Sequence, residues 1–397
     1  MRITRRVFLE ESVIKGGSFL CLAGMLGNGR VIKADVGKEV GFEVIQGRYI
    51  PNALYFSDRK PVVSIVKINE KWSAAKGVDY AVTEAIDLIG GVKKAAQGKE
   101  RILLKPNLVS PNQSDTTKSQ VIESLALLMK KAGKDVCIGE ASAAGVQNID
   151  ATLQGGVCKT SSFETLRAIQ DSLFTTLGYA DLSKRIAVPL VNLHIGKMVK
   201  MAIPDNFFFK ELYLHEALYN ADLVCSVPMM KTHSLANVTL ALKNVGIGGF
   251  PGLVYGTVRS DVHKKASEFE PTGTSSTTVD MVKANKIGLN VIDGSMAMQG
   301  NGPSTRSGGE VFPMNVIIAS TNALAADMVA ASVMGYDINE IDTFKWAWKA
   351  GMKPLNLEGI DIAGEKIEAV KRSFKRPNVV PYTSIKDWYG PPCKSGA

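Results

Sequence analysis

Short apolar runs alternate with amphipathic segments along most of the chain, and this alternation predicts the fold class. Apolar runs typical of buried strands occupy residues 62–68, 101–104, 135–138, 221–227, 288–292 and 315–319. Segments with apolar residues at helical spacing occupy residues 79–88, 119–132, 161–177 and 323–334. A strand, a helix and a second strand at this spacing form a parallel βαβ unit. We therefore expect an α/β fold: a largely parallel sheet flanked by helices, with Gly-rich loops at the C-terminal ends of the strands.

The segments between these elements set the expected domain organisation. Residues 186–193 and 197–203 are predicted to form an antiparallel strand pair. Residues 245–275 are predicted to form a long Gly-rich loop, of the kind that is usually functional or mobile. The expected organisation is an extended lead-in over residues 35–60, an α/β domain over 61–375 with room for two lobes, and a C-terminal tail over 376–397.

The N-terminus has the pattern of an export signal. Thr4-Arg5-Arg6-Val7-Phe8-Leu9 matches a twin-arginine motif, and the apolar stretch at residues 13–26 is too short to span a membrane. We expect residues 1–34 to be removed after Ala34 by way of the twin-arginine export machinery. The mature protein would then be exported, periplasmic or otherwise extracytoplasmic, and soluble, without a stable membrane span. The alternative is a basic, partly helical N-terminus that is never cleaved.

Charge and cysteine content exclude two further classes. The chain carries a formal charge of +9, of which residues 1–34 contribute +4, and no basic stripe interleaved with aromatic residues is present. A nucleic-acid partner is therefore not expected. None of the five cysteines lies at zinc-finger or cluster spacing, so no intrinsic iron–sulfur cluster is expected. Cys137 and Cys225 lie in strand runs, whereas an oxidising compartment would allow Cys158 and Cys393 to pair, which spacing alone does not decide.

Polar clusters follow three of the predicted strands. Lys105 and Asn107 follow the first, and Lys231-Thr232-His233, with Lys243-Asn244 further on, follow the second. Asp293 follows the third. Because ligands of parallel sheets bind beyond the carboxyl ends of the strands, we expect these side chains to converge on one pocket at one rim.

Lysines directly after apolar runs point to an anionic ligand, because a buried ammonium group needs an anionic partner. The alternative is an ion pair with Asp293 or Asp327. Asparagines suit hydrogen bonding to a ligand and turn stabilisation equally well, and glycines would let backbone amides approach a ligand. The expected anion-binding residues are Lys105, Asn107, Lys243, Asn244, Gly300 and Gly302.

Histidines supply the candidate chemistry. His233, His263 and Lys231 are the expected catalytic residues, for proton transfer or for stabilising an oxyanion. His233, His263 and Asp293 are the expected ligands of a metal ion, should the cofactor be one. The alternatives are a loop cap at His233, a solvated basic stretch around His263 and a local turn at Asp293. His194 and His215 flank apolar runs and are expected to be structural.

Taken together, these stretches resemble the DUF362 family. The matching segments are Lys105-Pro106-Asn107, Lys231-Thr232-His233, Lys243-Asn244-Val245-Gly246, His263, Asp293, Gly300-Asn301-Gly302-Pro303 and Asp327. Members of that family are sometimes fused to ferredoxin-type domains, which this sequence lacks. The layout is also loosely similar to that of nickel-dependent lactate racemases, in which a pair of histidines transfers protons at a carboxylate substrate.

These patterns favour an enzyme that acts on a small anionic molecule, with a metal ion or another cofactor of open identity. Two other functions remain open at this stage. One is a non-catalytic protein that binds a small anion and needs no titrating histidine. The other is a redox accessory protein that works with a separate iron–sulfur partner.

Overall fold

The computed structural model describes residues 42–381 except 70, 72 and 145–161. The predicted signal over residues 1–34 and its cleavage point lie outside the described residues, as do Cys158, Cys393 and most of the C-terminal tail. Of the remaining cysteines, Cys225 is buried and Cys137 is half-buried.

Two sheets organise the chain. The strands are β1 (Val44–Gln46), β2 (Val62–Lys67), β3 (Arg101–Pro106), β4 (Asp135–Glu140), β5 (Leu190–Asn192), β6 (Met198–Ala202), β7 (Glu211–His215), β8 (Leu223–Val227), β9 (Met229–His233), β10 (Asn237–Thr239), β11 (Ile287–Gly300), β12 (Gly309–Ser320) and β13 (Asp361–Gly364). The large sheet has the order β13-β2-β12-β11-β8-β3-β4-β5, with β9 and β10 attached beside β11, and the small sheet has the order β1-β6-β7. Strand β12 runs antiparallel to β2 and β11, and β10 antiparallel to β9, whereas the other pairs of the large sheet are parallel. The predicted α/β class with a largely parallel sheet is confirmed.

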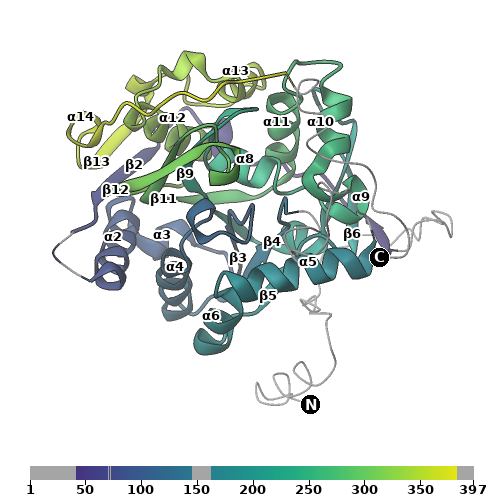
Figure 1. The fold of residues 1–397 in the computed structure, drawn as a ribbon, viewed down its shortest axis with the longest axis horizontal. Helices are drawn as coiled ribbons and strands as arrows, with labels where there is room; N and C mark the ends of the chain where they lie inside the picture. The colour runs from purple at the N-terminus through teal and green to yellow at the C-terminus, as the bar shows by residue number, and fades with distance from the viewer. Residues whose placement is uncertain (1–41, 70, 72, 145–161, 382–397) are drawn as a thin grey trace.

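Helices cover both faces of the large sheet (Figure 1). The α-helices are α2 (Ala74–Leu88), α3 (Gly91–Ala95), α4 (Ser119–Lys131), α5 (Phe163–Thr176), α6 (Tyr179–Ile186), α7 (Glu216–Asn220), α8 (Ala241–Gly246), α9 (Gly252–Tyr255), α10 (Ser260–Ala266), α11 (Ser275–Ala284), α12 (Ala323–Val333), α13 (Asp342–Lys349) and α14 (Ile367–Val370). Buried residues of α2, α4, α5 and α6 form one core, and buried residues of α8, α11, α12 and α13 form the other. The result is a three-layer sandwich.

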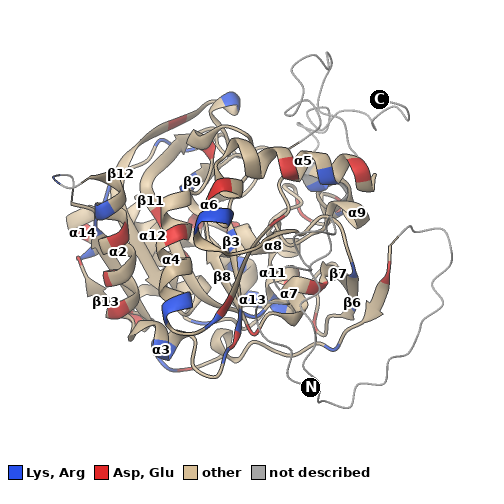
Figure 2. Cartoon of the chain, turned by 90° about the horizontal axis from the view of Figure 1, so that it is seen from below, with Lys and Arg blue, Asp and Glu red and all other residues tan. Residues whose placement is uncertain are grey.

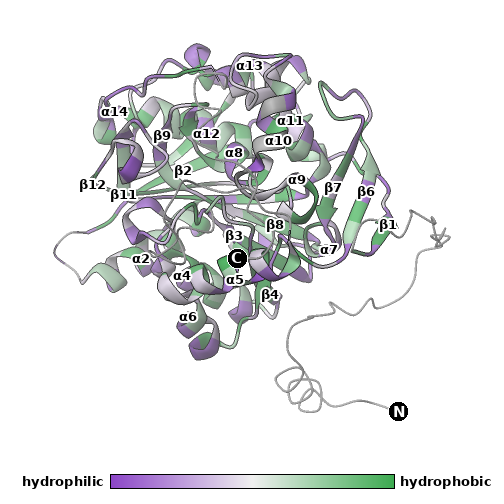
Figure 3. Ribbon diagram, turned by 45° about the vertical axis from the view of Figure 1, so that its right-hand side comes forward, coloured by the Kyte–Doolittle hydropathy of each residue, from purple (hydrophilic) through white to green (hydrophobic). Residues whose placement is uncertain are grey.

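Strand β3 illustrates why the sheet is central. Successive side chains of a strand point to opposite faces, and here both faces are buried. Ile102 and Leu104 pack into the core on the α4 side, whereas Leu103 packs into the core on the α8 side. This explains the continuous apolar run in the sequence. Figure 3 shows the same distribution, with hydrophobic strands inside and more hydrophilic outer helices.

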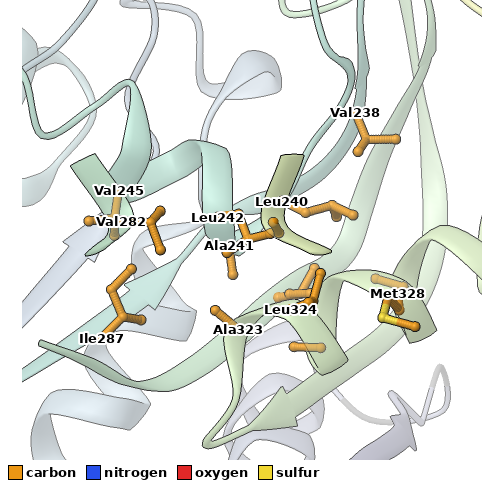
Figure 4. Packing of buried hydrophobic residues seen from close by; sticks show 14 of the residues in the cluster. Val238, Leu240, Ala241, Leu242, Val245, Val282, Ile287, Ala323, Leu324 and Met328 are labelled. Carbon is orange, nitrogen blue, oxygen red and sulfur yellow. The ribbon is translucent and has the colours of Figure 1, made fainter. Parts of the chain in front are cut away.

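The layer that carries α8 and α12 is packed from small and branched residues. Leu240, Ala241 and Leu242 at the start of α8 lie beside Ala323 and Leu324 of α12 (Figure 4). Every residue of α12 is buried, so this helix has no polar face. The tight packing holds α8 rigidly against the sheet, at the end where β8 terminates.

Several sequence-based boundaries are corrected by the structure. Residues 190–192 and 198–202 do not pair with each other, because β5 extends the large sheet beside β4 and β6 joins the small sheet. The predicted loop over residues 245–275 contains α9 and α10. These short helices were missed because they have fewer turns than a periodic pattern needs. Strands β11 and β12 are longer than predicted because they continue beyond the sheet as a hairpin.

Charged residues of both signs are interspersed along the helices (Figure 2). Within the described part of the chain, no helix combines the length and the apolar character that crossing a bilayer requires.

Candidate functional site

The parallel strands β3 and β4 end on a buried ion pair. Lys105, near the end of β3, donates from Nζ to Oε1 of Glu140 at 2.7 Å, and both side chains are at most 3% exposed. Glu140 also accepts the backbone amides of Leu108 and Ala141. Burial lowers the pKa of Lys105, and Glu140 opposes that shift. The partner of Lys105 is therefore a residue of the neighbouring strand, and neither Asp293 nor Asp327.

Asn244 connects this pair to α8. Its Nδ2 donates to the carbonyl of Lys105 at 2.9 Å and to the hydroxyl of Ser226 at 3.1 Å. Its Oδ1 is buried and has no hydrogen-bond partner among the described residues. Gly248 follows closely, and a Cβ there would lie 2.6 Å from Nζ of Lys105. Only glycine leaves room for the ammonium group at this point.

Arg259 approaches the same place from the segment between α9 and α10. It is 2% exposed and has φ of 52°, in the left-handed region. Its Nη2 donates to the carbonyl of Ala141, and the carbonyl of Gly248 lies 3.5 Å away. Its Nε is buried without a partner in the described part of the chain. Burial lowers the pKa of Arg259 to about 10, so the guanidinium stays charged at neutral pH.

Lys243 lies in α8 between these groups and is half-buried. It makes no hydrogen bond or ion pair with any residue that the structure describes. Burial, followed by repulsion from Arg259 and Lys105, lowers the pKa of Lys243 to about 7. An amine with this pKa is poised to gain a proton when an anion arrives.

Lys231 of β9 is fully buried, and its ammonium group donates its hydrogen bonds to backbone carbonyls. Its Nζ donates to the carbonyls of Asp115 at 2.7 Å and Pro303 at 3.1 Å. Burial lowers the pKa of Lys231 to about 7, and the Lys243 charge adds to the shift while the Asp115 carboxylate opposes it. Lys231 thus ties the tip of the β11–β12 hairpin to the sheet and also contributes positive potential. We call Lys105, Lys231, Lys243 and Arg259 the cationic cluster.

His233 and His263 lie beside the cationic cluster in opposite tautomers. Nδ1 of His233 accepts the amide of Leu235 at 3.0 Å, which places the proton of the neutral ring on Nε2. Nδ1 of His263 lies 3.0 Å from the carbonyl of Gly273, so that ring carries its proton on Nδ1. Burial, followed by repulsion from Lys243 and Lys231, holds the pKa of His233 well below its usual range. Burial lowers the pKa of His263 to about 4, with Lys243 and Arg259 adding to the shift.

Asp293 is used elsewhere, which corrects the predicted metal set. Its Oδ2 accepts the amide of Lys118, which caps α4, and its Oδ1 accepts the amide and hydroxyl of Ser295. In the described ranges, no three His, Cys, Asp or Glu side chains are grouped closely enough to hold a metal ion. His233, His263 and Asp293 are therefore not assembled as ligands, and the Asp293 carboxylate stabilises the bulge of β11 and the start of a helix.

The glycines of the β11–β12 hairpin are explained by packing. A Cβ on Gly302 would lie 2.1 Å from the carbonyl of Thr232, and Gly300 has φ of 75°. The carbonyl of Gly300 accepts the Thr232 hydroxyl at 2.7 Å. These contacts fasten the hairpin to β9, and they account for both glycines without a ligand.

Three other residues singled out from the sequence have local roles, whereas the side chain of Asn107 keeps an acceptor that no described residue satisfies. The amide of Asn107 donates to Thr117 at 2.9 Å, and Oδ1 of Asn107 is buried without a hydrogen-bond partner in the described segments. Asp327 accepts two amides at the start of α8. His215 caps α7, and His194 accepts the amide of Gly252. Both histidines serve local structure.

The structure thus brings together Lys105, Lys231, Lys243, Asn244, His233 and His263. Sequence reasoning missed Glu140 and Arg259. Glu140 did carry a signal, since it stands at the end of a strand run beside the strand of Lys105. Arg259 carried none, because its position depends on the path of a segment that has no strong periodicity.

Known proteins give context for this geometry. A curated relative, Thylakoid-associated protein sll1697 of Synechocystis sp., is 26% identical over 298 residues, which is 74% of this chain and 82% of that protein. The lactate racemase apoprotein from Thermoanaerobacterium thermosaccharolyticum aligns in three dimensions with a TM-score of 0.37 and 13% identity, covering 68% of this chain and 57% of the racemase.

The family comparison covers the whole of the site. The family model described as "Domain of unknown function (DUF362)" matches residues 102–332, a span that contains every residue of the cationic cluster and both histidines. The chain belongs to the DUF362 family.

Proposed function

We propose that the protein is an enzyme that binds a small anionic molecule at the cationic cluster and that His233 donates a hydrogen bond or a proton to it. The observation that carries this proposal is Lys243. Burial, followed by the charges of Arg259 and Lys105, lowers the pKa of its amine, and no carboxylate or carbonyl among the described residues receives its protons. Holding a partly buried cation beside other cations without a partner costs free energy, so a site of this kind is expected to have a function beyond stability.

The neighbouring groups explain why an anion suits this position. Lys105 has a carboxylate partner, and Lys231 donates to carbonyls, so both are held in place before a ligand binds. A ligand carboxylate or phosphate oxygen beside Lys243 would supply the missing acceptor. In a site shielded from water, such an interaction is stronger than at the surface.

His233 is the best candidate for proton transfer. Its Nδ1 is occupied by the Leu235 amide, so the Nε2 proton is the one that it presents. Burial, followed by the surrounding cations, lowers the pKa of His233 and keeps the ring neutral at physiological pH. A neutral imidazole that donates from Nε2 can stabilise negative charge developing on a ligand oxygen.

Thermal unfolding of the full chain tests the proposal. Inorganic phosphate and acetate are titrated at constant ionic strength, and the rise in Tm is compared between wild type and Lys243→Met. Binding to the folded state alone raises Tm, so wild type should respond to at least one anion. Lys243→Met should lose affinity by about tenfold or more, equivalent to about 1.4 kcal/mol.

The matched control is Lys93→Met, which removes an exposed lysine of α3 far from the strand ends. This variant should respond to anions as wild type does. An anion response that is the same in Lys243→Met and Lys93→Met would contradict the proposal, as would a wild type that does not respond at all.

A further inference from the structure

We propose that the site selects a compact dianion, the phosphoryl group of a phosphate monoester, and that Arg259 is the residue that sets this preference. This inference rests on the proposed function and adds the substrate class. It comes from the charge balance of the site, the crowding of its cations and the unmet hydrogen-bonding capacity of Arg259.

The charge balance favours two negative charges on the ligand. The cationic cluster contains four basic side chains, and the carboxylates whose charges act on them are Glu140 and Asp115. Lys118 also acts on Lys231, but the Asp293 carboxylate acts on Lys118 in turn, so this pair adds no net charge. With the four basic side chains protonated, as a bound anion favours, and the two carboxylates ionised, the site has a formal charge of +2. A monocarboxylate would neutralise half of this charge, whereas a phosphate monoester carries about −1.5 to −2 at neutral pH.

The cations are crowded around one short stretch of backbone. Nζ of Lys105 would lie 2.6 Å from a Cβ on Gly248, and the carbonyl of Gly248 lies 3.5 Å from Nη2 of Arg259. Ala141 donates its amide to Glu140, the partner of Lys105, and accepts from Arg259 through its carbonyl. Lys243 is repelled by both cations. A phosphoryl group concentrates its charge on one tetrahedral centre and suits this crowding better than a dicarboxylate.

Arg259 has the means to recognise such a group. Its Nη2 is anchored to the carbonyl of Ala141, so the plane of the guanidinium is held in one orientation. Its Nε is buried with no acceptor among the described residues. Because Nη2 already donates to backbone carbonyls, Nε is the donor left for a ligand, and a lysine cannot hold one nitrogen on the backbone while it presents a second N–H to a phosphate oxygen. The orphaned donor is what a second phosphate oxygen would satisfy.

A ligand series on the wild-type protein tests the charge and the compactness together. Methyl phosphate, dimethyl phosphate, malonate and acetate are titrated by calorimetry at neutral pH and constant ionic strength. The expected result is that methyl phosphate binds about tenfold or more tightly than each of the other three, a difference of about 1.4 kcal/mol.

Each alternative outcome overturns a different step. Dimethyl phosphate or acetate binding as tightly as methyl phosphate would overturn the preference for a dianion and leave the proposed function standing. Malonate binding more tightly than methyl phosphate would overturn the compact phosphoryl group. If none of the four anions binds, the proposed function itself falls.

Arg259→Lys then tests the assigned residue. The variant keeps the positive charge but loses the planar pair of donors. It should weaken methyl phosphate by about tenfold and change acetate by less than about threefold. Equal losses for both ligands would show that Arg259 supplies only charge, and the assignment would be overturned. Chemical unfolding of Arg259→Lys without ligand checks that the variant folds. If it does not fold, the wild-type ligand series still tests the preference for a phosphate monoester.

Discussion

Two buried carboxyl groups and two cations of the site are treated differently in this molecule. Asp280 accepts three backbone amides, from residues 207–209, at 2.8 to 2.9 Å. Asp327 accepts the two amides that begin α8, at 2.7 and 2.8 Å. Each of these carboxylates fastens one segment to another, and its hydrogen-bonding capacity is used inside the protein. Both groups are structural.

Lys243 and Arg259 form the opposite case. Lys243 has no acceptor among the described residues, and Arg259 keeps a buried Nε without one. Both carry positive charge, and they lie beside other cations. The contrast teaches that burial of a charge does not by itself indicate function. What separates the two regions is whether the protein supplies the partners, and variants that change those partners test this distinction.

The largest expected effect comes from breaking the Lys105–Glu140 pair. Lys105→Met leaves Glu140 buried beside an apolar side chain, and removing one partner of a buried pair typically costs about 3–5 kcal/mol of the free energy of unfolding. Chemical denaturation measures this loss. The double variant Lys105→Met with Glu140→Leu should be less destabilised than the sum of the two single variants by about 1.5 kcal/mol or more. Additive losses would mean that the two side chains are not coupled.

Asp280→Ala should destabilise the protein by about 3 kcal/mol, because three backbone amides lose their acceptor and some regain water. Asp280→Asn keeps one acceptor oxygen and should lose less. Neither variant should change the affinity for methyl phosphate, measured on the folded protein. A loss of methyl phosphate affinity in Asp280→Asn would mean that this carboxyl group also contributes to ligand binding.

Lys243→Met should leave the ligand-free protein as stable as wild type or more stable, by about 1–2 kcal/mol, because the variant removes a repelled and partly buried cation. The side chain is only half-buried, and solvent limits the gain. Denaturation without anions is the measurement. Destabilisation by more than about 2 kcal/mol would mean that Lys243 has a structural role.

The pH dependence of the free energy of unfolding should contain a contribution from the Lys243 amine. Its pKa is about 7 in the folded protein and 10.5 ordinarily, so between these values the unfolded chain binds more protons. Stability therefore rises with pH through this window, and the destabilising contribution is fully present below about pH 7. Relative to Lys243→Met, wild type should gain about 1 kcal/mol between about pH 7 and 9, less than the limit of about 1.4 kcal/mol per pH unit. A difference that does not vary with pH would mean that this amine titrates normally.

The smallest effect on ligand affinity is expected for His233→Gln. This ring contributes one neutral hydrogen bond, so methyl phosphate affinity should fall by about threefold, equivalent to about 0.6 kcal/mol. Any turnover should fall far more, because proton transfer by a positioned side chain contributes about 100-fold or more. Equal losses of binding and turnover would mean that His233 does not transfer a proton, and a wild type without turnover would favour the non-catalytic binding protein.

The chemistry near the strand ends could be predicted in part from sequence. Lys105 and Lys243 follow apolar runs, and such lysines point to the rim of a parallel sheet. Whether Asp293 is a metal ligand could not be decided from the sequence, because Asp suits both metal ligation and a hydrogen bond to its own backbone. The hairpin glycines posed the same ambiguity, since close backbone packing and ligand approach both demand glycine.

By itself, the sequence determined the α/β class, most of the strands and the four longest of the described helices. These properties follow from short-range periodicity, which any segment carries within itself. Only the tertiary structure decided that Lys105 is neutralised by Glu140, that Lys243 is not neutralised by any described residue, and that Arg259 reaches the same place. Those outcomes depend on which distant segments the core packs together, and the pattern of a single segment does not contain that information.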